Sequence, residues 1–167
     1  MGNPHIPKAL DVAKEVSDYL RNSGAQTRSG SLYDEDFREV FRQQDFDLLI
    51  ALGGDGTMLR AGHLCAPLDI PLLGINVGHF GFLVELKRDD WQGFLHKLLK
   101  GDFRYEERMM LSAHCICGGK EKTVFDVIND VVVARGQFVR PIEIEAFWND
   151  SYITSYEYYS ASQEIAR

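Results

Sequence analysis

The sequence predicts an α/β fold, with a parallel-sheet N-terminal domain at residues 1–103 and a partial antiparallel β domain at residues 104–167. Two short apolar runs, Leu48–Leu52 and Leu72–Ile75, each lead into a glycine-rich segment. Such runs are typical of buried parallel strands. After Gly101 the pattern changes to alternating apolar and polar residues, which favours antiparallel strands. A βα region followed by a run of strands indicates two domains.

The segments before the first apolar run predict two helices and a weak strand. Apolar residues recur at helical spacing in Pro7–Arg21, and Asn22-Ser23-Gly24 ends that helix. Ala25–Ser31 is interpreted as a weak strand and Tyr33–Gln44 as a polar helix with one apolar face. No strand precedes the first helix, although a helix in an α/β domain normally connects two strands. We therefore expect the first strand to be missing from this chain.

Both apolar runs are followed by a loop and a helix. Helices are predicted at Met58–Cys65 and at Asp89–Gly101, where Gly101 is the expected stop. The second glycine-rich segment runs from Gly74 to Leu83. Because ligands in open α/β sheets bind beyond the carboxyl ends of the strands, we expect both glycine-rich loops to lie at one ligand-binding edge.

The second domain is predicted to contain four strands. The hairpin turns are expected at Gly118-Gly119-Lys120 and at Asn149-Asp150. The strands are expected at Glu107–Cys117, Thr123–Ala134, Pro141–Trp148 and Ser151–Tyr156. Four strands with one apolar face need a partner layer, so we expect a truncated β-sandwich or one that depends on a neighbouring chain.

Composition excludes several classes of function. The chain has 167 residues and a net charge of −7, which argues against a nucleic-acid surface because such a surface needs a basic stripe. No apolar run is long enough to span a bilayer, so no membrane partner is expected. Three cysteines, an odd count, do not make a disulfide framework. These features favour a protein of the reducing cytoplasm.

The segment Gly53-Gly54-Asp55-Gly56-Thr57 carries the strongest chemical signal. Glycines let a backbone approach a ligand closely, and a helix N-terminus suits phosphate. A carboxylate at Asp55 would repel phosphate, so it needs a reason, either a magnesium ion or a hydroxyl to be deprotonated. The alternative is a plain turn in which Asp55 caps the helix. That alternative is weakened because Thr57 could cap unaided and because further glycine-rich turns follow.

Four motifs, in this order, resemble those of the NAD kinases. They are Gly53–Thr57 after a strand, Gly74-Ile75-Asn76 with Gly78, Gly81-Phe82-Leu83 and Glu85, then Glu107–Leu111, and Asn129–Val133 with Arg135 and Arg140. The first motif also has counterparts in diacylglycerol and sphingosine kinases and in phosphofructokinases. The ordered combination, which covers Phe46–Tyr156, is specific to NAD kinases.

The resemblance implies transfer of a phosphoryl group from ATP, or from polyphosphate, to the adenosine-ribose 2′-hydroxyl of NAD, which yields NADP. Mg²⁺ would arrive with ATP, no metal site of the protein's own is implied, and the family assembles as dimers or tetramers. By matching position, the resemblance implies that Asp55 is the base and that Gly54 and Gly56 lie at the diphosphate. It implies that Phe82 lies at adenine and that Arg140 contacts the nucleotide. Asn129 and Asp130 would hold ribose and adenine groups of the dinucleotide.

The sequence departs from the family pattern near its end. Tyr159 and Ser160 stand where relatives have aspartate and glycine, and the threonine- and serine-rich loop that follows is absent. We therefore expect a fragment, or a chain with an altered end. Two other hypotheses stay open. One is a non-catalytic nucleotide-binding module, and the other is a lipid kinase domain, against which Asn129-Asp130 argues.

Other candidate residues favour structural roles. Cys115 and Cys117 share one face of a strand, but their spacing is unlike that of zinc sites, so buried free thiols are the preferred interpretation. His79 lies inside the second glycine-rich loop, where contact with phosphate and ordinary loop placement are both open. His63 and His96 are expected on helices and are assigned no function.

Overall fold

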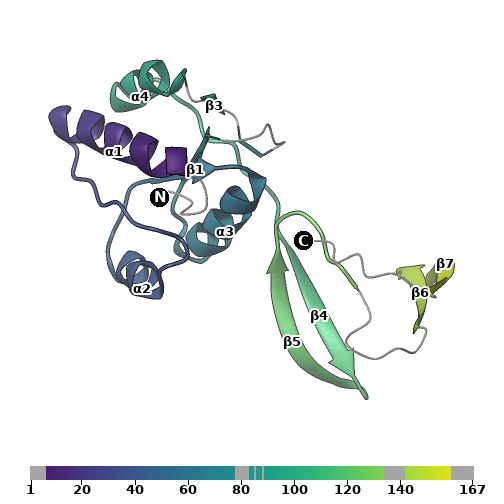
Figure 1. The fold of residues 1–167 in the computed structure, drawn as a ribbon. Coiled ribbons are helices and arrows are strands. Elements are labelled where there is room, and N and C mark those ends of the chain that lie inside the picture. Colours follow the sequence, from purple (N-terminus) through teal and green to yellow (C-terminus); the bar gives the residue numbers. More distant parts are fainter. Residues whose placement is uncertain (1–6, 78–82, 85, 88, 134–141, 159–167) are drawn as a thin grey trace. The chain divides into compact units, whose positions relative to one another are not determined.

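The computed structural model describes residues 7–77, 83–84, 86–87, 89–133 and 142–158 (Figure 1). The chain divides into two compact units, Met1–Asn129 and Asp130–Arg167. The first hairpin thus belongs to the first unit, and the boundary predicted at residue 104 stays a prediction. The fold class is confirmed, since a parallel sheet is followed by antiparallel strands.

A three-stranded parallel sheet organises the first unit. Strands β1 (Leu49–Gly53), β2 (Leu72–Asn76) and β3 (Leu86–Lys87) are hydrogen-bonded in the order β1-β2-β3. β1 and β2 pair without a shift, from Leu49 opposite Leu72 to Gly53 opposite Asn76. Both strands therefore end at the same edge of the sheet. The short strand β3 was not predicted.

Helices cover both faces of this sheet. Figure 1 shows α1 (Pro7–Asn22) and α4 (Trp91–Leu99) on one side, and α2 (Glu35–Gln43) and α3 (Asp55–Cys65) on the other. Alternation along β1 explains this arrangement, because successive side chains of a strand point to opposite faces. One core cluster holds Leu32, Phe41, Leu49, Ala51, Ala61, Leu64 and Cys65. The other holds Ala9, Val12, Val16, Leu52, Ile75, Val77, Trp91 and Leu95.

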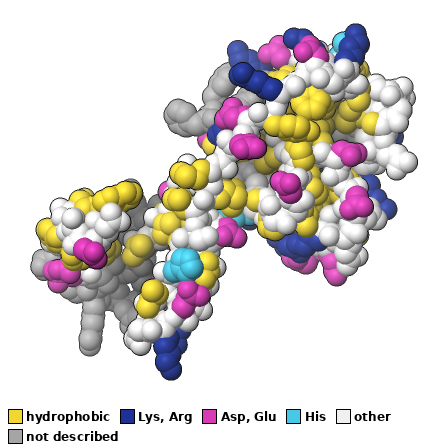
Figure 2. Space-filling view, turned by 180° about the vertical axis from the view of Figure 1, so that it is seen from behind, with side chains coloured by type: hydrophobic (Ala, Val, Ile, Leu, Met, Phe, Trp, Pro, Cys, Tyr) yellow, Lys and Arg dark blue, Asp and Glu magenta, His cyan; other side chains and the backbone are white. Residues whose placement is uncertain are grey.

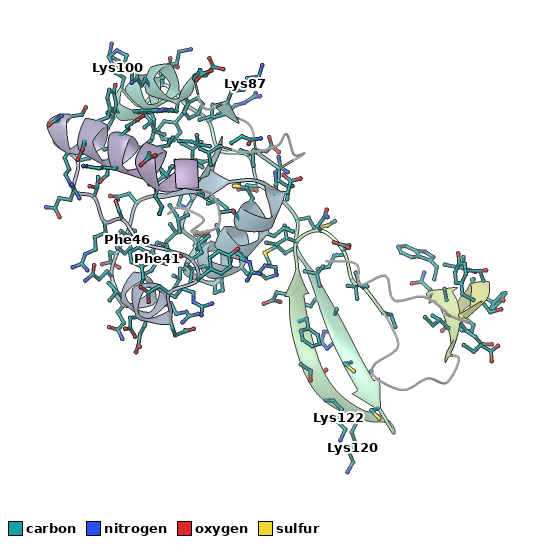
Figure 3. All side chains as sticks on the ribbon, in the orientation of Figure 1. Phe41, Phe46, Lys87, Lys100, Lys120 and Lys122 are labelled. Atoms are coloured by element: carbon teal, nitrogen blue, oxygen red, sulfur yellow. The ribbon has the colours of Figure 1, made fainter. Side chains whose placement is uncertain are left out.

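Local signals explain where α2 begins and how it packs. The Asp34 carboxylate caps the helix, accepting from the amides of Asp36 and Phe37 at 3.1 and 3.4 Å. Phe41 on α2 stacks against Phe46, with ring centroids 5.0 Å apart and an interplanar angle of 10° (Figure 3). This stack joins the helix to the segment that leads into β1.

Two hairpins follow α4. β4 (Leu111–Cys117) pairs with β5 (Lys120–Val127), and β6 (Ile142–Trp148) pairs with β7 (Ser151–Tyr158), both antiparallel. Many of their large apolar side chains are exposed, and Figure 2 shows apolar atoms on the hairpin surfaces. The most exposed members include Ile116 at 66%, Trp148 at 73% and Tyr156 at 63%. These apolar side chains are exposed among the described residues.

Several predicted elements need correction. Residues 25–30 form no strand, and Ser31 makes only an isolated bridge. This run is polar and has no alternating apolar positions, so it gains little from joining a sheet. β5 ends at Val127, so that Asn129 and Asp130 follow the strand instead of lying within it. α4 ends at Leu99, two residues before the predicted stop, and this last residue is 43% exposed.

Candidate functional site

The glycine-rich turn joins β1 directly to α3. β1 ends at Gly53, Gly54 is the N-cap in an extended conformation, and Asp55 is the first residue of the helix. The helix therefore begins three residues before the predicted start at Met58. Gly54 has no side chain with which to cap the helix, and its carbonyl oxygen accepts from the Thr57 amide at 2.9 Å.

Thr57, which could have capped the helix, lies inside its first turn, and Gly54 takes the capping position. Thr57 is only 3% exposed, and its side chain packs back over Gly53. A Cβ added at Gly53 would lie 2.2 Å from the Thr57 Oγ1 and 2.6 Å from its Cβ. Gly53 is thus required because the first turn of α3 folds tightly onto the end of β1. Gly56 has no such neighbour, since nothing lies within 4 Å of a Cβ built there.

A second glycine allows α3 to approach the neighbouring strand. A Cβ on Gly74 of β2 would lie 2.5 Å from the sulfur of Met58 and 3.3 Å from Val84 Cγ1. The missing side chain lets Met58 pack onto β2, which brings the first turn of α3 close to the end of that strand.

The Asp55 carboxylate faces the second glycine-rich segment. Its Oδ1 accepts a hydrogen bond from the Leu83 backbone amide at 2.9 Å, and the contact is partly buried. The two residues are 28 positions apart, so this bond joins the ends of the two predicted loops.

Asn76 is a polar residue at this edge to which the sequence analysis gave no separate role. It ends β2, lies opposite Gly53 in the register, and is buried with 8% exposure. A buried amide side chain at the carboxyl end of a parallel strand is well placed to meet a ligand. The signal that could have identified it is its position, directly after the last apolar residue of the strand.

The remaining predicted site residues are distributed differently. Asn129 is the last residue of the first unit and Asp130 the first of the second, and both are exposed. The structure places Gly54, Asp55 and Gly56 together in the turn that begins α3. Phe82, His79 and Arg140 lie outside the described residues.

The two strand cysteines correct another prediction. Cys115 and Cys117 are exposed free thiols instead of buried ones, because no layer covers β4 in the described chain. In the described part of the chain, no group of three or more His, Cys, Asp or Glu side chains could hold a metal ion. Cys65 is buried, and desolvation raises the pKa of its thiol to about 12.

The structure also contains a groove of about 640 Å³. It is lined by residues of α1, α2, β1 and the end of α4, and by residues 25–29 and 44–48. None of the predicted site residues lines this groove, so we do not assign it to the same site.

None of the helices among the described residues has the length and hydropathy that a bilayer span requires.

The fold and the turn define an α/β domain of the nucleotide-binding class. A parallel sheet lies between two layers of helices, and its first described strand ends at a bare helix N-terminus with one acid. Residues 2–103 match the model of the ATP-NAD kinase N-terminal domain. The chain belongs to the NAD kinase family.

Individual relatives agree with this assignment. The chain is 37% identical over 163 residues to the NAD kinase of Caldanaerobacter subterraneus subsp. tengcongensis, covering 92% of this chain and 57% of that protein. It is 41% identical over 145 residues to the NAD kinase of Natranaerobius thermophilus, covering 85% and 49%. The chain thus spans about half the length of the curated relatives it matches.

A solved structure supports the fold alone. The crystal structure of yeast NADH kinase complexed with NADH superposes with a TM-score of 0.56 at 19% identity. The match covers 84% of this chain and 43% of the yeast chain.

Proposed function

We propose that this chain performs the NAD kinase reaction, in which a phosphoryl group passes from ATP, or from polyphosphate, to the 2′-hydroxyl of the adenosine ribose of NAD. The product is NADP. Family membership supports this proposal. The observation that carries it is the Asp55 carboxylate, held by the Leu83 amide beside a helix N-terminus whose cap is glycine.

Asp55 is assigned as the general base that accepts the proton of the 2′-hydroxyl. Phosphoryl transfer depends mainly on positioning and charge stabilisation, and a base at the attacking oxygen completes the requirement. Gly54 and Gly56 let the backbone amides approach diphosphate, and the space around Gly56 supports this role.

The rest of the nucleotide site is proposed from motif position. Asn129 and Asp130 would hold ribose and adenine groups of the dinucleotide, Phe82 would contact adenine, and Arg140 would contact the nucleotide. A carboxylate and an amide together suit a ribose diol, since hydrogen bonds to a charged acceptor are about twice as strong as neutral ones.

Mg²⁺ is proposed as part of the ATP substrate. Mg²⁺ commonly binds through substrate phosphates and water with only one or two carboxylates. The described residues provide no cluster for a resident metal ion, and Asp55 is the acid nearest the proposed diphosphate position. These residues therefore fit an ion that the phosphates carry, whose charge would offset that of the transferred group.

The substitution Asp55→Asn tests the assigned base. Asparagine keeps an oxygen that can accept from the Leu83 amide, so the fold is preserved while the base is removed. Turnover should fall by about 10²- to 10⁴-fold while NAD affinity changes little. Asp47→Asn, an exposed acid before β1, is the matched control and should leave turnover unchanged. Turnover of the Asp55 variant at the parent rate would refute the assignment.

Calorimetry with NAD and with ATP separates this proposal from its alternative. Binding of NAD without turnover by the parent chain would support a non-catalytic nucleotide-binding module. Binding of neither nucleotide would contradict both. Family membership already disfavours the lipid kinase hypothesis.

We also propose self-association and a cytoplasmic location. Exposed apolar side chains on both hairpins favour a dimer or tetramer, because such faces are stabilised by covering. Light scattering coupled to gel filtration measures the mass directly, and a monomer at micromolar concentration would contradict the association. The three free thiols are compatible with a reducing compartment.

A further inference from the structure

One histidine connects α3 to the first hairpin. The Nδ1 of His63 lies 2.7 Å from the Leu59 carbonyl oxygen on its own helix. Its Nε2 lies 2.9 Å from the Asp126 carbonyl oxygen on β5, which is 63 positions away. The ring therefore bridges two backbone carbonyls of different elements.

Hydrogen-bond chemistry determines the protonation that satisfies both contacts. A carbonyl oxygen can only accept, and a neutral imidazole carries a single N–H donor. The neutral ring can make one of these bonds, whereas the imidazolium makes both. Bonds with a charged donor are also the stronger kind.

A second contact lies beside the first. Gly62 precedes His63 on α3, and a Cβ built on it would lie 2.6 Å from the Cδ1 of Ile128. Ile128 therefore packs against the helix where the helix has no side chain. Two adjacent residues of α3 thus contact the end of β5 and the residue just beyond it. We call these two contacts the α3–β5 joint.

The joint lies between two parts of the proposed site. Asp55 begins α3, and Gly62 follows seven residues later, which is about 10 Å along a helix at 1.5 Å per residue. Asn129 is the next residue after Ile128. One rigid helix thus carries the proposed base at its first residue and contacts the segment that leads to the proposed ribose-binding pair.

We infer that His63 is a positioning residue that holds the Ile128–Asn129 segment against α3. Its consequence for nucleotide binding rests on the proposed function.

Nuclear magnetic resonance on the 167-residue chain tests the inference without NAD. The amide signals of Ile128 and Asn129 should move in His63→Asn and should stay near their parent positions in His63→Gln, which can still donate to the Asp126 carbonyl oxygen. Unchanged amide signals in His63→Asn would overturn the inference.

A matched pair of variants separates the two bonds. Glutamine at position 63 can place its amide near the Nε2 position and donate to Asp126, whereas asparagine reaches only the Nδ1 position near Leu59. Hydrogen exchange at Ile128 should therefore accelerate roughly 2- to 10-fold more in His63→Asn than in His63→Gln, as expected for one lost hydrogen bond. Equal exchange in both variants and the parent would contradict the joint.

Titration with NAD tests the proposed function and the role of His63 separately. If the parent binds NAD, His63→Asn should weaken binding more than His63→Gln, and both should retain the Asp55-dependent chemistry. If the parent binds no NAD, the proposed function fails, while the exchange measurements still decide the role of His63.

Discussion

Two glycines of the same turn are expected to respond in opposite directions to alanine. Gly53→Ala should destabilise the protein, because the added methyl would overlap the Thr57 side chain at 2.2–2.6 Å. Gly56→Ala should stabilise it slightly, because nothing lies within 4 Å of that position and alanine favours a helix.

The magnitudes follow from the surroundings. Thr57 is β-branched and 3% exposed, so it cannot rotate away freely, and overpacking of this kind typically costs about 1–3 kcal/mol. At Gly56 the gain is at most about 1 kcal/mol, the difference in helix propensity between glycine and alanine. The two variants should therefore differ by roughly 1–4 kcal/mol in the free energy of unfolding.

Urea denaturation measures this difference, provided that the slope with denaturant is the same for both variants. Equal midpoints for the two variants would refute the packing explanation. Nucleotide binding adds a second result. The methyl of Gly56→Ala would stand where diphosphate is proposed to lie, so this variant should be more stable and yet bind NAD or ATP less tightly. Unchanged affinity would remove Gly56 from the proposed site.

Three further outcomes are expected. Asp34→Ala should cost about 1 kcal/mol in urea denaturation, because the amides capped at the start of α2 lose their acceptor; a change below 0.3 kcal/mol, roughly the error of such measurements, would contradict the cap. Leu95→Ala should cost about 2–5 kcal/mol, because Leu95 is 0% exposed, whereas Leu99→Ala, at a residue 43% exposed, should cost far less. A thiol reagent at pH 8 should modify the two cysteines of β4 and should spare Cys65 until urea is added. Burial raises the pKa of the Cys65 thiol to about 12, so almost no thiolate is present at pH 8. Rapid modification of Cys65 in the native protein would show that it is not buried.

Parts of the fold that depend on short-range pattern could be predicted from the sequence. The apolar runs at β1 and β2 indicated buried parallel strands, and the glycines after them indicated the edge at which Asp55 lies. The hairpin turns were also correct, since Gly118 and Gly119 both adopt positive φ angles. In each of these cases one residue type satisfies a local backbone requirement.

Features that depend on distant partners could not be predicted in this way. Residues 25–30 were assigned to a strand, but a strand requires a neighbour, which the local sequence does not specify. The exposure of Cys115 depends on whether another layer covers β4. The His63 contact with β5 joins residues 63 positions apart, and a histidine on a helix carries no sequence signal for such a partner.

The start of α3 shows a different kind of error. Side-chain capping by Thr57 was a reasonable expectation, since threonine is a good N-cap. Glycine is also acceptable at that position, and a glycine cap leaves amides available to a ligand. The residue that departs from the best capping choice is therefore the one to suspect of a functional role.

The exposed apolar faces of the two hairpins should affect how long this chain persists inside a cell. Side chains such as Trp148 and Ile116 resemble the surface that a half-folded protein shows to chaperones and degradative proteases. The steady-state amount of the protein would then depend on whether a partner covers these faces before chaperones or proteases bind them. Conditions that supply a covering partner should lengthen the half-life of the polypeptide, even if its catalytic rate is unaltered.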